Sequence, residues 1–151
     1  MTVQHFLVPI DFSLYAEQAL DYAITLAQKL QAHVTLLHVI HPPLVAGADM
    51  GVWPSRAFLD ELEAAIRRDM EGYLAHVTAA GLEGEMAVVH GIPFHEILET
   101  AKKRQVDLII MGTHGRTGLP HVLLGSVAEK VVRLASCPVL IARQPTPDVV
   151  S

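Results

Sequence analysis

The sequence predicts an α/β domain in which an open sheet of five parallel strands carries helices on both faces. Short, nearly continuous apolar runs alternate with stretches in which apolar residues recur every three or four positions. Runs of the first kind are typical of strands buried on both sides of a parallel sheet, and stretches of the second kind of amphipathic helices. The composition agrees, because 51% of the 151 residues are hydrophobic and one domain of this length can bury a large core.

Five apolar runs are the expected strands. They are His5 to Ile10, His33 to Ile40, Glu85 to His90, Leu108 to Met111 and Pro138 to Ala142. Most are rich in leucine and in β-branched residues, which favour a pleated and buried surface. Because a helical pattern separates each run from the next, the connections must cross over the sheet. This predicts parallel strands with right-handed crossovers.

Four helical stretches separate these runs. Their apolar stripes lie within residues 16–30, 59–77, 94–101 and 127–135. Ser13 is expected to cap the first helix, Gly81 to end the second and Pro93 to begin the third. The fourth helix follows the glycine-containing loop after Met111, which carries the main functional signal.

Two segments depart from this alternation. Residues 41–56 contain three prolines and two glycines without a usable period, which predicts a long irregular loop. Met50 and Trp53 in this loop would either form a lid or partner surface, or anchor the loop against the core. Residues 145–151 are expected to be a frayed tail, which leaves residues 1–144 as the domain.

Charge, targeting signals and reactive residues narrow the class of protein. A net charge of −5 without a lysine and arginine cluster argues against a nucleic-acid partner. No apolar stretch reaches about 18 residues and no signal-peptide pattern is seen, so we expect a cytoplasmic protein without membrane contact. The single cysteine, Cys137, is expected to be buried and inert. The nine histidines show no local ligand spacing, so no metal site is predicted.

The stretch from Asp107 to Val127 carries the main functional signal. Gly112, Gly115 and Gly118 follow its apolar run. Glycines can adopt backbone angles closed to other residues, so successive N–H groups could converge on an anion. The alternative is a tight, solvated turn. The motif is neither a P-loop, since no lysine follows the last glycine, nor a dinucleotide motif, since the first strand-to-helix turn has no glycine.

Further residues of this stretch also suit a phosphate. Gly125 and Ser126 open the fourth helix, where free N–H groups and the helix dipole favour an anion. Ser126 would donate to a phosphate or serve as an ordinary N-cap. His114 and Arg116 could reach a phosphate, and for Arg116 the alternative is a solvated side chain.

Asp11 follows the first strand and would face the glycine loop if the first and fourth strands are neighbours. An ionised carboxylate only accepts hydrogen bonds, so Asp11 suits a ribose hydroxyl or a phosphate-bound Mg²⁺. The alternative is a carboxylate that caps or turns the chain before the first helix.

The chain resembles a universal stress protein of the UspA-like, ATP-binding subgroup, whose signature is G-x2-G-x9-G-[S/T]. Here Gly112, Gly115, Gly125 and Ser126 supply that signature, and LVPIDFS, HGIPFHEILETA, VDLIIMGTHGRTGL and LLGSVAEKVVRLASCPVLIAR extend the match along the chain. The resemblance implies a Rossmann-like, adenine nucleotide alpha hydrolase-like sheet with strand order 3-2-1-4-5. It also implies a homodimer, a role in stress response, and ATP bound between the loops after the first and fourth strands.

The resemblance further implies which residues contact ATP. Those expected at the nucleoside end are Pro9, Asp11, Val39, Met111 and Gly112. Those expected at the phosphates are Gly115, Gly125, Ser126 and Val127. The expectation that His114 and Arg116 also reach a phosphate rests on their place in the loop and not on the resemblance.

The last strand, Pro138 to Ala142, predicts a contact with a second copy of the chain. Its five apolar residues carry no inward charge that would protect an exposed edge, so pairing with the same strand of a second copy is expected. No kinase-type set of residues, Walker lysine or acidic pair stands at a recognisable spacing. A nucleotide-responsive regulator is therefore favoured. The alternatives are a slow ATPase or phosphotransferase that uses the same pocket, and a dimeric scaffold that acts without nucleotide.

Overall fold

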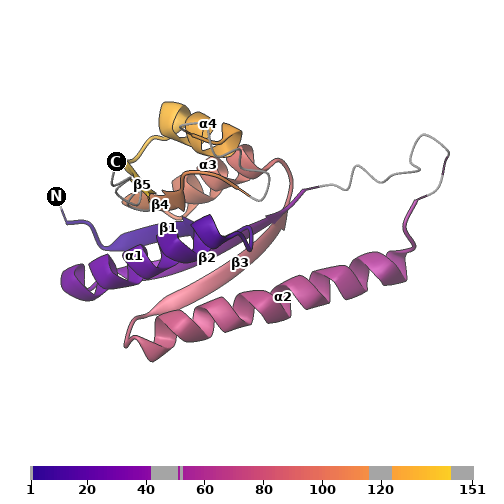
Figure 1. Cartoon of the computed structure of the whole chain (residues 1–151), viewed down its shortest axis with the longest axis horizontal. Helices are drawn as coiled ribbons and strands as arrows, with labels where there is room; N and C mark the ends of the chain where they lie inside the picture. The colour runs from indigo at the N-terminus through magenta and orange to yellow at the C-terminus, as the bar shows by residue number, and fades with distance from the viewer. Residues whose placement is uncertain (1, 42–50, 52, 116–123, 144–151) are drawn as a thin grey trace, which may run out of the picture.

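The computed structural model describes residues 2–41, 51, 53–115 and 124–143. Within them, five strands form one parallel sheet of order β3-β2-β1-β4-β5 (Figure 1). The strands are β1 (His5–Pro9), β2 (His33–Ile40), β3 (Gly84–His90), β4 (Leu108–Gly112) and β5 (Val139–Ala142). The helices are α1 (Leu14–Leu30), α2 (Arg56–Ala79), α3 (Pro93–Lys103) and α4 (Ser126–Leu134). The predicted fold class and strand order are confirmed.

The sheet separates two hydrophobic layers. Alternate residues of β1 point to opposite faces, so Phe6 and Val8 join the core on the side of α1 and α2. Leu7, between them, joins the core on the side of α3 and α4. Figure 1 shows the two helix pairs on opposite sides of the strands.

The central strand, β1, is where the direction of winding reverses. It pairs with β2 from His5↔His33 onward, and on its other side with β4 at Phe6↔Leu108. Because parallel strands all end at the same edge, the loops after β1 and β4 leave the sheet side by side. The structure therefore places the two loops of the predicted site next to each other.

Helix α1 begins and ends as expected from its sequence. The Ser13 hydroxyl accepts a hydrogen bond from the Ala16 N–H at 3.2 Å, which confirms the predicted cap. The buried positions are mostly alanines, so the helix lies close to the sheet.

Pro93 stands in the first turn of α3, as predicted. Gly81, just beyond α2, has a φ of 81° and donates its N–H to the Thr78 carbonyl, which suits a helix terminus.

Helix α2 differs from the expected pattern. Met70 and Val77 are its fully buried residues, whereas Leu59 and Leu62 remain 39% and 41% exposed. The expectation of a buried stripe along the whole helix is wrong, because the first turns of α2 extend past the strands (Figure 1). Trp53, before the helix, is 71% exposed, which does not fit the alternative of a loop anchor against the core.

Smaller departures occur elsewhere. Leu134 belongs to the apolar spacing that predicts α4 but is 53% exposed, whereas Ala128 is buried. Cys137 is half-buried against the core rather than fully buried, and burial raises the pKa of its thiol. The predicted tail and most of the irregular loop, with Met50, lie outside the described residues. Among the described helices none is both long and apolar enough to cross a membrane.

Candidate functional site

Asp11 lies at the carboxyl edge of the sheet and its two carboxylate oxygens have different surroundings. Oδ1 accepts hydrogen bonds from the backbone N–H of Ser13, at 3.0 Å, and from the Ser13 hydroxyl. Oδ2 faces the glycine loop, since a Cβ added to Gly115 would lie 2.8 Å from it. The structure therefore brings Asp11 and Gly115 together. Oδ1 stabilises the turn before α1, which is the structural role that the sequence offered as the alternative to ligand contact.

Phe12 holds this turn in a strained conformation. Its φ of 64° lies in the left-handed region, which costs a residue with a side chain about 1 kcal/mol or more. The Phe12 ring packs on His38, with ring centroids 4.7 Å apart, and on Tyr73, at 5.8 Å. Nδ1 of His38 lies 2.6 Å from the carbonyl oxygen of Ile10, an acceptor, so Nδ1 carries the proton. These contacts fix the turn that presents Asp11, and no local sequence signal marks Phe12 or His38 for that role.

The glycines of the motif differ in how much room surrounds them, and none of the described ones has a left-handed backbone angle. A Cβ on Gly112 would lie 2.7 Å from the carbonyl oxygen of Tyr15, and a Cβ on Gly125 would lie 3.2 Å from Cα of His114. The φ angles of Gly112, Gly115 and Gly125 all lie outside the left-handed region. The expectation of an unusual backbone angle is therefore wrong at Gly115, and at Gly118 it lies outside the described residues. At Gly112 the lack of room for a Cβ comes from the close approach of α1 to β4.

The start of α4 folds back onto the end of β4. The Gly125 N–H donates to the Thr113 carbonyl at 2.7 Å, so both ends of the G-x9-G segment are held together. Gly125 is the N-cap, and Ser126 is the first helical residue. The alternative that Ser126 is the N-cap is therefore wrong. Gly125 has no side chain that could cap this helix, and the first N–H groups of a helix have no acceptor within it.

The remaining predicted residues take up positions around this edge. Pro9 ends β1, while Val39 and Met111 each precede the last residue of their strands. The His114 ring lies 5.3 Å from the Tyr15 ring, and its Nδ1 is 2.9 Å from the Thr113 hydroxyl. Val127 lies in the first turn of α4. Two other members of the glycine loop, Arg116 and Gly118, lie outside the described residues.

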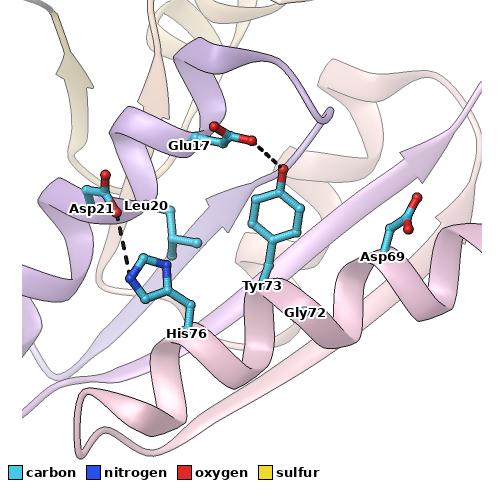
Figure 2. Close-up of a pocket in the computed structure, with 7 residues that line it drawn as sticks. All are labelled: Glu17, Leu20, Asp21, Asp69, Gly72, Tyr73 and His76. Atoms are coloured by element: carbon cyan, nitrogen blue, oxygen red, sulfur yellow. Dashed lines mark hydrogen bonds and ion pairs between the residues drawn. The ribbon is translucent and has the colours of Figure 1, made fainter.

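A separate pocket of about 330 Å³ lies between α1 and α2 (Figure 2). Its lining residues are Glu17, Leu20, Asp21, Asp69, Gly72, Tyr73 and His76. The Tyr73 hydroxyl donates to Glu17 at 3.0 Å, and burial followed by this hydrogen bond raises the pKa of Tyr73 to about 12. The pocket presents three carboxylates, which would repel a phosphate. It is therefore no alternative place for the predicted anion.

Comparisons with known proteins agree with this geometry. The model of the Universal stress protein family matches residues 2–143. The universal stress protein YxiE of Bacillus subtilis is 36% identical over 143 residues, which cover 91% of this chain and 97% of YxiE.

Two solved structures have the same fold. That of MJ0577 from Methanocaldococcus jannaschii superposes with a TM-score of 0.84 at 31% identity, covering 97% of this chain and 100% of the other. A universal stress protein solved in complex with cAMP superposes with a TM-score of 0.72 at 24% identity, covering 96% and 100% of the two chains. At that identity the second likeness shows the fold alone.

Proposed function

This chain belongs to the universal stress protein family, and we propose that it binds ATP at the carboxyl edge of its sheet as a nucleotide-responsive regulatory homodimer. The observation that carries the proposal is the position of Asp11 against Gly115, where a Cβ on the glycine would come within 2.8 Å of Oδ2. This contact joins the loop after β1 to the loop after β4, at the point where the winding of the sheet reverses.

Two groups of residues near Asp11 would hold ATP, one at its nucleoside end and one at its phosphates. Oδ2 would accept a hydrogen bond from a ribose hydroxyl or coordinate a phosphate-bound Mg²⁺. The adenine would lie against the ends of the strands, and the residues that would hold this nucleoside end are Pro9, Val39, Met111 and Gly112. The phosphates would lie over Gly115 and the first turn of α4, where N–H groups without an acceptor in the helix favour an anion. The residues that would complete the phosphate contacts are His114, Arg116, Gly125, Ser126 and Val127.

Two further points support an adenine nucleotide. The glycine and serine spacing is that of the family's ATP-binding signature. The universal stress protein solved with cAMP has this fold, so the fold is compatible with an adenine nucleotide. The proposed location is the cytoplasm, as the sequence predicts.

Regulation is favoured over catalysis because the sequence holds no catalytic set of residues at a recognisable spacing. In the described part of the chain, one oxygen of Asp11 is already held by two hydrogen bonds from Ser13. A slow ATPase or phosphotransferase is the alternative function. Timed incubation with ATP and Mg²⁺ separates the two, because turnover that is lost in Asp11→Ala would establish catalysis in place of regulation.

Isothermal titration calorimetry with ATP and Mg²⁺ tests the binding site. Gly115→Val would push a side chain into Asp11, so we expect about a tenfold or greater loss of ATP affinity. Gly72→Val is the matched control, because nothing lies within 4 Å of a Cβ at Gly72. Circular dichroism checks that both variants fold. Equal affinity in the wild type and in Gly115→Val would rule out the proposed site.

The homodimer is proposed to form through β5, the last strand of the sheet. This strand pairs with β4 on one side, and the Pro138 carbonyl accepts the Ile109 N–H. Since bonded groups alternate along a parallel ladder, the N–H of Ile141 points to the outer side. Ile141→Pro would therefore leave the β4 pairing in place and block pairing with a second copy. Light scattering should give a dimer for the wild type and a monomer for the variant. A monomeric wild type at micromolar concentration would disprove the dimer and leave a nucleotide-binding monomer.

A further inference from the structure

A second group of polar side chains gathers at the opposite, amino edge of the sheet. His5 and His33 begin β1 and β2, and the register pairs them directly. Glu85 lies on β3 opposite Thr35 of β2. One possible ligand atom from each of His5, His33 and Glu85 lies within 4.8 Å of the other two.

We propose that His5, His33 and Glu85 bind a divalent transition-metal ion of the Zn²⁺ class. Two imidazole nitrogens and a carboxylate oxygen form a donor set that Zn²⁺ accepts, with water in the fourth position. Bonds of tetrahedral Zn²⁺ place neighbouring donor atoms about 3.3 Å apart. Nε2 of His33 and Oε1 of Glu85 are already 3.5 Å apart. These two ligands are therefore close to the required geometry before an ion arrives.

Thr35 connects two of the proposed ligands, Glu85 and His5. Its side chain is fully buried, and its hydroxyl donates to Oε1 of Glu85 at 2.9 Å. The same hydroxyl lies 2.8 Å from Nε2 of His5. The ion would replace the Thr35 contact on His5, while Thr35 keeps its hydrogen bond to Glu85. Hydrogen bonds of this kind hold ligating carboxylates in place in many metal sites.

The charges around the cluster suit a cation. Glu85 pairs with Arg104, and Asp107 accepts the backbone N–H of His5 at 2.9 Å. With both histidines neutral, two carboxylates and one guanidinium leave a net negative charge at this edge. Histidine spacing in the sequence predicts no metal site. Local spacing does not reveal residues that meet across three strands.

Titration of the chelator-treated, nucleotide-free full chain with Zn²⁺ tests the site. We expect one ion per chain with a dissociation constant below about 10 µM, and a higher melting temperature with Zn²⁺. His33→Gln and Glu85→Gln should each weaken binding by about tenfold or more, and should remove the Zn²⁺-dependent rise in melting temperature. His95→Gln is the matched control, since His95 is exposed on α3. Co²⁺ offers a second readout, because a tetrahedral site gives it a strong visible absorption.

The outcomes divide cleanly. Binding that is lost in the two ligand variants and kept in the control supports the site. Failure of the wild type to bind at 100 µM Zn²⁺ would overturn it, because a site that weak has a binding free energy of no more than about 5.5 kcal/mol. An equal loss in His95→Gln would also overturn it, because binding would then be spread over exposed histidines. None of these results depends on whether the chain binds ATP.

Discussion

The two edges of this sheet bring polar groups together in different ways. At the carboxyl edge, the groups lie on the segments that follow β1 and β4, and the glycine motif follows a single strand in the sequence. At the amino edge, His5, His33 and Glu85 come from three strands and meet only through the register of the sheet. A site of the first kind leaves a local sequence pattern, whereas a site of the second kind leaves none.

The edges also differ in what they offer a ligand. At the carboxyl edge Gly115 lets its loop approach the Asp11 carboxylate closely, and Gly125 opens α4 without a side-chain cap, which suits an anion. At the amino edge the side chains already contact one another, which suits a small cation. The following changes test this contrast, beginning with the largest expected effect.

Gly112→Val should be the most damaging change at the carboxyl edge. A Cβ there would lie 2.7 Å from the carbonyl oxygen of Tyr15, so α1 must move away from β4. We expect the free energy of unfolding to fall by about 3 kcal/mol. Urea denaturation measures this, with Gly72→Val as the control in open space. Equal stability of the two variants would mean that the close approach of α1 to β4 is not needed.

Two substitutions of Asp11 should separate its two roles. Asp11→Asn keeps an oxygen for Ser13 but removes the charge, so ATP affinity should fall by about tenfold with little loss of stability. Asp11→Ala should lose the same affinity and in addition about 1 kcal/mol of stability, because the turn before α1 loses its acceptor. Calorimetry and urea denaturation give the two quantities. Unchanged ATP affinity in both variants would leave Asp11 with a structural role alone.

Tyr73→Phe should change alkaline stability through a group that belongs to neither edge. The pKa of Tyr73 is raised to about 12 from 10.0 in the folded chain, so the unfolded chain loses this proton first. Stability from this group is present below pH 10.0 and decreases as the pH rises toward about 12. The variant should show a shallower loss of melting temperature over that range. Equally steep curves for the wild type and the variant would contradict the assignment.

The smallest expected effect is that of a substitution at one edge on ligand affinity at the other edge. Gly115→Val should leave Zn²⁺ affinity unchanged, and His33→Gln should leave ATP affinity unchanged, because the two groups share no contacts. Calorimetry of each variant with both ligands measures this. A loss of both affinities from one substitution would show that the edges are coupled through the sheet.

Much of the fold could be predicted because its signals are local. Each strand is a continuous apolar run, and Ser13, Gly81 and Pro93 mark helix ends through chemistry within a few residues. The exposed first half of α2 could not be predicted, since a helical pattern does not tell how far the sheet beneath it extends. Leu134 likewise has the right spacing for burial but lies at the end of α4, beyond the core.

The candidate site divides in the same way. The glycine loop and Asp11 could be predicted because each directly follows an apolar run. The reason for the glycines could not, because the 2.7 Å approach of Tyr15 to a Cβ on Gly112 depends on how α1 packs on β4. The positive φ of Phe12 and the meeting of His5 with His33 are also tertiary effects.

The most direct test of the central claim is the nucleotide content of the purified full chain, combined with its melting temperature in added ATP and Mg²⁺. The account predicts that acid extraction of the wild type releases ATP, and that Gly115→Val releases little. For nucleotide-free wild type, ATP at 100 times its dissociation constant should stabilise the fold by about 2.7 kcal/mol. A wild type that carries no ATP and melts at the same temperature with millimolar ATP would contradict nucleotide binding at this edge.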